Sequence, residues 1–467
     1  MKTSSSSFTK LIVLTIYFCY SFTLKAQTPP QFVSDSLQAI LNRALPTNFP
    51  QSGCIMRIES PGQWIWEGAV GSAIAGITSG QPQTVATPQH QFRVGSITKM
   101  MVATCILKLE QQGLLNINDA INFYLRPTLV NDTIAASDTV RIRHLLNHTS
   151  GIDNSANNTS CQMNVLSNLL ASHSLEEAVY CGASQGEIAT PGLVWAYSNT
   201  NYSLLAMIIE KVTGMSYQQY ITQNLFIPLN LNNTFIPTTP QISPAHMGCY
   251  WNLGTWTDLT VINATAYTGW ADIVSTTADL IKFYKELKAG NIINNTELTT
   301  MYTIDPASFG YGMGLDFWTF SGTSYVGHYG EVANTSGLFF GNITSPLAPN
   351  GFYISYNFNI QGADMQVTID NPVIEFLKNT TTGVKENKLT TFNVYPNPTK
   401  DFIYVNIGKQ KINELYVMDL FGKKVFGLNE DTHDDVIKIS LEKIEKGIYF
   451  LAIKTNEGIQ TQKIIVE

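Results

Sequence analysis

The positive charges of the chain are distributed very unevenly, and this limits the fold to at least two separate parts. Residues 27–384 contain 13 lysines and arginines in 358 positions, whereas residues 385–467 contain 12 lysines and no arginine in 83 positions. A chain of 467 residues is also longer than one ordinary domain. We therefore predict a first domain at residues 27–380, a linker at 381–391 and a second domain at 392–467.

The first 26 residues have the pattern of a secretory signal peptide. Lys2 and Lys10 precede an apolar run at residues 11–24, and the small residue Ala26 follows. The run has 14 residues, fewer than the roughly 20 that cross a membrane as a helix. The sequence therefore predicts cleavage after Ala26, export, and no transmembrane anchor.

Export permits disulfides, and five cysteines remain after the signal peptide is removed. Because five is odd, at least one is unpaired. Cys161 and Cys181 bracket a polar loop and a short helix, so we expect these two to pair. Cys105 lies in a very apolar stretch and is expected to be a buried thiol.

The net charge of −7 and the pI near 5.6 argue against nucleic acid as a partner, because nucleic-acid binding needs a basic face. No Cys-x-x-Cys occurs, so a zinc ribbon is not expected. His144 and His148 are four residues apart, a spacing that can bind a metal, but no glutamate lies between them to act as a base. We expect neither a metal nor another cofactor.

Residues 27–380 alternate between helical and strand patterns. Helices are predicted at 34–45, 96–112, 275–290 and 365–378, a hairpin at 53–71 with its turn at Pro61-Gly62, and successive strands within 309–359. Strands at both ends with helices between them favour an α/β (α+β) fold in which helices flank one antiparallel sheet.

The second part has an all-β pattern. Its short β-branched and aromatic segments are separated by turn residues, at 402–408, 414–422, 424–428, 436–441, 447–455 and 460–466. This pattern is typical of a small β-sandwich.

Three Ser-x-x-Lys sequences occur, at Ser7–Lys10, Ser96–Lys99 and Ser440–Lys443. Ser96 opens the apolar helix predicted at 96–112, where the helix N-terminus favours developing negative charge. Lys99 lies one turn further on, and a lysine at the edge of such a core tends to a lowered pKa, so it could help to take the serine proton. Equally, Ser96 could be a simple helix cap and Lys99 could point outward. The stretch alone leaves both interpretations open.

Two downstream motifs favour the catalytic interpretation. Tyr197-Ser198-Asn199 precedes an apolar helix, and His328-Tyr329-Gly330 lies on a predicted strand. With Ser96 and Lys99, this order and spacing resembles the penicillin-recognising serine hydrolases over residues 35–378. The branch it resembles contains class C β-lactamases, serine D-alanyl-D-alanine carboxypeptidases and related esterases. The resemblance implies a sheet, a helical subdomain and a cleft between them.

The resemblance also implies roles for the first two motifs. Ser96 would be the nucleophile that carries the acyl group, and Lys99 would share its proton. Tyr197 would be the general base and later the acid, with a phenol pKa that Lys99 lowers. Asn199 would hydrogen-bond the substrate amide and Lys99.

The third motif is expected to form the other side of the cleft. The backbone N–H groups of Ser96 and Glu331 would form the oxyanion hole, and Gly330 would let the strand approach the substrate. His328 would supply polarity, or positive charge, on the cleft wall. Tyr329 and Glu331 replace smaller residues common in the family. Both are expected to narrow the cleft, and the glutamate would disfavour an anionic β-lactam or peptide C-terminus.

The tail of the chain resembles a second family. The sequences YPNP (395–398), DLFGKKV (419–425), KGIYFLAIKTNEG (446–458) and the terminal KIIVE are similar to the type A sorting domain of the type IX secretion system. This implies passage through the periplasm and across the outer membrane of a Bacteroidetes-like bacterium, with later removal of the domain. A carbohydrate-binding or adhesive β-domain is the alternative.

Together these features predict a secreted or cell-surface serine hydrolase that forms an acyl-enzyme on an ester or amide. An esterase or a D-amino-acid carboxypeptidase-like enzyme is favoured over a class C-like β-lactamase. Two rival hypotheses are an inactive homologue that binds peptidoglycan or another ligand, and a surface adhesin.

Overall fold

The computed structural model divides the chain into two compact units, with the division after residue 381. It describes residues 27–125, 134, 137–242, 245–380, 392–407, 412–419, 423–428, 435–455 and 458–467. The predicted signal peptide (1–26) and linker (381–391) lie outside these residues, so the predicted domain limits stay predictions. Within the described ranges, no helix has both the length and the apolar character needed to cross a membrane.

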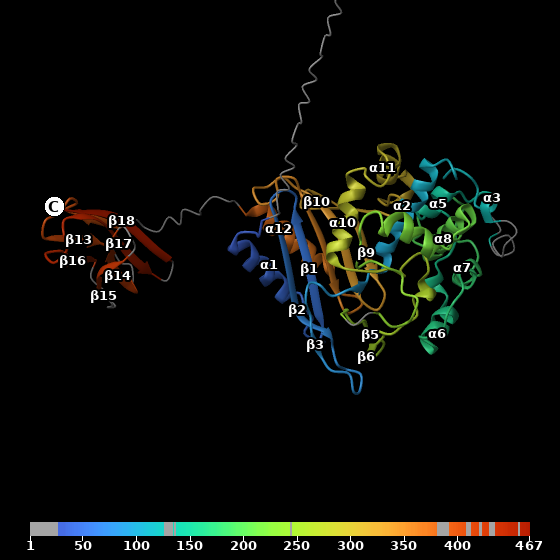
Figure 1. Cartoon of the computed structure of the whole chain (residues 1–467), viewed down its shortest axis with the longest axis horizontal. Coiled ribbons are helices and arrows are strands. Elements are labelled where there is room, and N and C mark those ends of the chain that lie inside the picture. The colour runs from blue at the N-terminus through green and yellow to red at the C-terminus, as the bar shows by residue number, and fades with distance from the viewer. Residues whose placement is uncertain are drawn as a thin grey trace, which may run out of the picture. The chain divides into compact units, whose positions relative to one another are not determined.

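The first unit is built on a seven-stranded antiparallel sheet (Figure 1). Its order is β3 (Thr84–Val85), β2 (Trp64–Ile74), β1 (Gly53–Ser60), β11 (Phe352–Phe358), β10 (Thr335–Asn342), β9 (Thr323–Glu331) and β8 (Asp316–Phe320). The predicted hairpin is β1–β2, and Gly62 takes the positive φ of 75° that its turn requires. The first and the last strand of this sheet in chain order, β1 and β11, therefore pair with each other in its middle.

Helices cover both faces of the sheet. On one face, α1 (Gln31–Arg43) and α12 (Asn371–Asn379), with the π-helical turn η6 (Gln366–Asp370) before it, enclose one apolar core. On the other face, α2 (Thr98–Gln111) and α10 (Thr277–Lys288) belong to a second, larger core (Figure 1). Every side chain of α2 from Thr98 to Leu107 is buried, which explains its almost uniformly apolar sequence.

Further helices form a layer beyond α2 (Figure 1). They are α3 (Asn122–Leu125), α5 (Ile142–Leu146), α6 (Thr159–Ser167), α7 (Leu175–Ala183), α8 (Asn199–Thr213), α9 (Tyr217–Ile221) and α11 (Asn295–Tyr302). The central helix α8 contacts α2, α3, α5, α7 and α9. The expected antiparallel sheet with a helical subdomain is confirmed.

One predicted strand is shorter than expected. The apolar stretch at 309–320 forms a strand only over β8, because the chain turns at its start. Phe309 has a left-handed φ of 51° and is 89 % exposed, and Gly310 continues the turn at a φ of 87°. An aromatic-rich sequence predicted a strand here, but local turn geometry took precedence.

The second unit is a β-sandwich, as expected. One sheet has the order β12 (Asn393–Tyr395), β13 (Phe402–Asn406), β16 (Val436–Ser440), and the other has the order β15 (Lys424–Leu428), β14 (Glu414–Met418), β17 (Gly447–Thr455), β18 (Gly458–Val466). The core between them includes Ile403, Val405, Leu415 and Leu451. Among the described residues of this unit, β12 is the one strand that the sequence pattern did not predict.

Candidate active site

Ser96 lies on a tight turn that is pressed against the end of strand β9. The 3-10 turn η1 (Gly95–Ile97) leads into α2, and Gly95 has a φ of 57°. A Cβ atom at Gly95 would come within 2.4 Å of the backbone nitrogen of Glu331. A Cβ atom at Gly330 would come within 2.0 Å of the carbonyl oxygen of Val94. Both glycines are therefore needed for this close backbone approach.

Lys99 does not point outward, which was the alternative that the sequence left open. Its side chain is 0 % exposed. Its Nζ atom lies 2.8 Å from Oγ of Ser96, 2.9 Å from Oδ1 of Asn199 and 3.2 Å from the carbonyl oxygen of Trp270. The first two motifs thus meet at one amine, although 100 residues separate Lys99 from Asn199.

Burial lowers the pKa of Lys99 well below its ordinary value, and the charges of Asp316 and Asp272 oppose this shift only in part. This matches the direction expected from the sequence. Burial also raises the pKa of each of these two carboxyl groups to about 7, and the charge of Lys99 opposes that rise. The neutral amine is thereby favoured, and a neutral amine can accept the proton of Ser96.

The expectation that Lys99 lowers the phenol pKa of Tyr197 is wrong. Burial raises the pKa of Tyr197 well above its ordinary value, and the negative charges of Asp316 and Glu331 raise this pKa further. A hydrogen bond with Ser96 lowers it only in part. The Nζ atom of Lys99 lies 4.9 Å from the centre of the Tyr197 ring. A buried phenol among carboxylates keeps its proton, so the geometry favours Tyr197 as a proton donor.

His148 holds the second motif in place, a role that the sequence did not reveal. Its Nδ1 atom accepts a hydrogen bond from the backbone N–H of Ser198 at 3.2 Å, and its carbonyl oxygen accepts one from Ala196 at 2.9 Å. Its ring lies 4.3 Å from that of Tyr197, centre to centre. The sequence gives no signal for this contact, because 50 residues separate His148 from Ser198.

His328 is not on the cleft wall, contrary to expectation. It is buried, and its Nε2 atom lies 2.9 Å from the hydroxyl of Tyr311 while Nδ1 lies 2.5 Å from the carbonyl oxygen of Tyr329. Burial lowers the pKa of His328 to about 3, and the charge of Lys99 adds to this shift. The imidazole is therefore neutral and supplies no positive charge to a substrate.

Tyr329 does not narrow the cleft, because its side chain leaves the sheet on the opposite face. Its hydroxyl donates to Oδ2 of Asp370 at 2.6 Å, and its ring packs against Phe339 in the core under α1 and α12. Side chains alternate along a strand, so Tyr329 and His328 point to opposite faces. Glu331 does reach the cavity, where its Oε1 atom accepts weakly from the backbone N–H of Gly362 at 3.3 Å.

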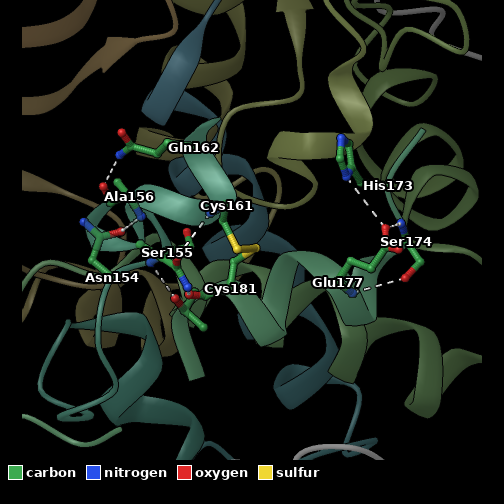
Figure 2. The surroundings of a disulfide bond; sticks show 11 residues. Asn154, Ser155, Ala156, Cys161, Gln162, His173, Ser174, Glu177 and Cys181 are labelled. Carbon is green, nitrogen blue, oxygen red and sulfur yellow. Dashed lines mark hydrogen bonds and ion pairs between the residues drawn. A yellow bond between two sulfur atoms is a disulfide. The ribbon is translucent and has the colours of Figure 1, made fainter. Parts of the chain in front are cut away.

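A cavity of about 1060 Å³ opens at Ser96, Tyr197, Asn199 and Glu331. Its far side is formed by α6, α7 and the chain around Trp251. Cys161 of α6 and Cys181 of α7, the pair expected from the sequence, form a disulfide in this wall (Figure 2). Cys54, Cys105 and Cys249 are buried free thiols.

No metal site accompanies this constellation in the part of the chain that the structure describes. The Nδ1 atom of His144 accepts from the backbone N–H of Arg141 at 3.2 Å, and His148 is engaged with Ser198. The two histidines that share a metal-like spacing therefore each accept a hydrogen bond from a backbone N–H group, that of Arg141 for His144 and that of Ser198 for His148.

The sequence model of the β-lactamase family matches residues 59–376, which include every residue of the site described above. The chain belongs to the β-lactamase family. This family contains serine hydrolases, and the resemblance inferred from the three motifs is confirmed. A second model, described as a secretion system C-terminal sorting domain, matches residues 393–467 and confirms the resemblance of the tail.

This chain is similar in sequence to a curated bacterial protein and in fold to solved enzyme structures. PbpX of Bacillus subtilis (strain 168), a protein named for penicillin binding, is 31 % identical over 229 residues, or 49 % of this chain. The match spans about half of the length of PbpX, 54 %. A D-stereospecific amidohydrolase from Streptomyces sp. is 27 % identical, with a TM-score of 0.62 over 74 % of this chain and 98 % of that protein.

A D-amino acid amidase from Ochrobactrum anthropi SV3 has the same fold, with a TM-score of 0.61 and 22 % identity. The aligned region covers 73 % of this chain and 98 % of the amidase. Each fold match therefore takes in almost the whole of the solved protein and about three quarters of this chain.

Proposed function

We propose that the β-lactamase-family unit is a serine hydrolase that acts on an ester or amide through an acyl-enzyme on Ser96. The observation that carries the proposal is the position of the Lys99 amine, fully buried and 2.8 Å from Oγ of Ser96. Covalent catalysis usually relies on a nucleophile, a base at hydrogen-bond distance from it, and a third group that orients the base. Here Asn199 is that third group.

In the first step, Lys99 accepts the proton of Ser96 while Oγ attacks the carbonyl carbon of the substrate. The backbone N–H groups of Ser96 and Glu331 stabilise the oxyanion that forms. The bond to the leaving group then breaks, and the leaving group takes a proton from Tyr197 or Lys99. In the second step the group that gave its proton to the leaving group, Tyr197 or Lys99, accepts a proton from water as the water oxygen attacks the acyl carbon. The acyl–Ser96 bond then breaks, Lys99 returns a proton to Oγ of Ser96, and the acid is released.

Within this class, an esterase or a D-amino-acid amidase or carboxypeptidase-like enzyme is favoured over a β-lactamase. The 27 % identity to a D-stereospecific amidohydrolase supports an amide substrate. Glu331 favours the esterase or the amidase over both the β-lactamase and the carboxypeptidase-like enzyme, because its carboxylate borders the cavity next to the proposed oxyanion hole. A negative charge at this place repels the carboxylate of a β-lactam and that of a peptide C-terminus.

Covalent labelling of the wild-type protein tests the proposal. We expect a fluorophosphonate probe to label it, because such probes react with any activated serine of a hydrolase. A fluorescent penicillin is expected to label it at least about tenfold more slowly, for the reason given for Glu331. Equal labelling by both probes would favour the β-lactamase, and labelling by neither would favour an inactive binding homologue.

We also propose that the sorting domain directs the protein through type IX secretion to the outside of the cell and is then removed. The support is the match of residues 393–467 to the secretion sorting family. Intact mass of protein recovered from the medium or the cell surface is expected to lack residues 392–467. A mass that still includes them would contradict removal and would favour the adhesive alternative.

A further inference from the structure

Part of the lining of the cavity that opens at Ser96 is apolar and has its own small core. Leu259 and Ala333 are buried together with Cys249, and Leu166 and Trp251 pack against them. This group is separate from the two large cores on either side of the sheet. We call Leu166, Trp251, Leu259 and Ala333 the apolar wall, and all four line the same cavity as Ser96.

The charges around this cavity exclude an anionic ligand group. Glu176, Glu177 and Glu331 line it, and no lysine or arginine does so among the residues with a described position. Lys99 is buried behind Ser96, with its amine taken up by Ser96 and Asn199. An apolar ligand group that contacts the apolar wall is therefore stabilised by the removal of its surface from water. An anionic ligand group would have no cation there with which to pair.

The helix that carries Leu166 is held in place mainly by covalent and polar links. Helix α6 has no buried side chain. Cys161 near its start is bonded to Cys181 of α7 (Figure 2). Asn158 caps the helix with Oδ1, and its Nδ2 donates to the carbonyl oxygen of Cys181 at 2.9 Å. Helix α7, in contrast, buries Ala178 and Val179 and packs on α8, which carries Asn199. The disulfide thus attaches the loosely packed helix to the firmly packed one.

We propose that the apolar wall is the subsite for a bulky, uncharged acyl group of the substrate, and that the Cys161–Cys181 disulfide positions it. This inference rests on the proposed acyl-enzyme function of Ser96. An acyl group bonded to Oγ of Ser96 extends into the cavity, where the apolar wall offers an aliphatic or aromatic chain a surface that is backed by its own buried core.

Three esters test the subsite: p-nitrophenyl acetate, p-nitrophenyl hexanoate, and the mono-p-nitrophenyl ester of adipic acid. The third has the chain length of the second but ends in a carboxylate. We expect the wild-type kcat/KM for hexanoate to exceed that for acetate by about tenfold or more, since one methylene in an apolar pocket is worth at least that factor. We expect it to exceed that for adipate by a similar factor, because the carboxylate of adipate would lie in a cavity that is lined by glutamates and has no cation. Equal values for the three esters would overturn the inference.

Variants locate the subsite. Trp251→Ala and Leu166→Ala are each expected to reduce the hexanoate-to-acetate ratio by about threefold or more. Met163→Ala is the matched control, because Met163 lies on the same helix but is 59 % exposed and does not line the cavity. A ratio that is unchanged in all three variants would contradict the assignment.

The role of the disulfide is tested with the Cys161→Ser/Cys181→Ser double variant. We expect KM for hexanoate to rise about threefold or more, with kcat for acetate within about twofold of wild type, because the chemistry at Ser96 does not involve α6. A fall in kcat for both esters would assign the disulfide to general stability and not to positioning.

Failure of fluorophosphonate labelling in wild type would overturn the proposed function and this inference together. Labelling without a preference for the longer ester would overturn this inference alone.

Discussion

Replacing Ser96 with alanine is expected to abolish covalent labelling and to lower ester hydrolysis to the detection limit. No other hydroxyl lies within hydrogen-bond distance of the Lys99 amine among the described contacts. In serine hydrolases the loss of the nucleophile alone costs on the order of 10⁶ in kcat. The measurement is fluorophosphonate labelling together with initial rates on p-nitrophenyl hexanoate.

Ser440→Ala provides a matched control. Ser440 begins another Ser-x-x-Lys sequence, but it lies exposed on strand β16 of the second unit. This variant is expected to label and react like wild type. Labelling that persists in Ser96→Ala would assign the nucleophile to another residue and would overturn the proposed mechanism.

Replacing Lys99 is expected to have the second largest effect, and two variants distinguish its two roles. Lys99→Gln removes the amine but keeps hydrogen-bonding groups near Ser96 and Asn199. Lys99→Arg keeps a positive charge that cannot be lost near neutral pH. If Lys99 is the base, both variants lose about 10²–10⁴-fold in kcat/KM. If it supplied only charge, the arginine variant would keep most of the activity. Thermal unfolding of both variants checks that the fold is retained.

The pH dependence follows from the same assignment. The neutral amine is the active form, so kcat/KM is expected to rise with pH through the lowered pKa of Lys99 and then to level off. The pKa values of Asp272 and Asp316, raised to about 7, place further titrations close to neutrality. His328, with its pKa lowered to about 3, does not titrate in the usual assay range.

Much of the fold could be predicted because its signals are local. The apolar sequence after Ser96, the cap at Thr276 that accepts from the backbone N–H of Asp279, and the Pro61-Gly62 turn each lie within a few residues of the element they define. The stretch at 309–320 was predicted less well. There a left-handed turn at Phe309, which no strand propensity reveals, shortens the strand.

The three motifs could also be found in the sequence, but the behaviour of their side chains could not. The partners that hold the site come from distant segments: His148 under Tyr197, Tyr311 beside His328, and the carbonyl group of Trp270 at Lys99. His148 is 50 residues from Ser198, Tyr311 is 17 residues from His328 and Trp270 is 171 residues from Lys99, so no short sequence pattern connects them. Only the folded chain brings them together.

The sequence by itself determined the family, the order of the motifs, the secretion tail and the choice of Ser96 over the two other Ser-x-x-Lys sequences. Those properties depend on residue identity and spacing. The tertiary structure decided that Tyr197 keeps its proton, that His328 is neutral and that Tyr329 points away from the site. The two protonation states depend on how far burial removes each side chain from water, and the direction of Tyr329 depends on the face of β9 on which it lies. Both are determined by residues that come together only after folding.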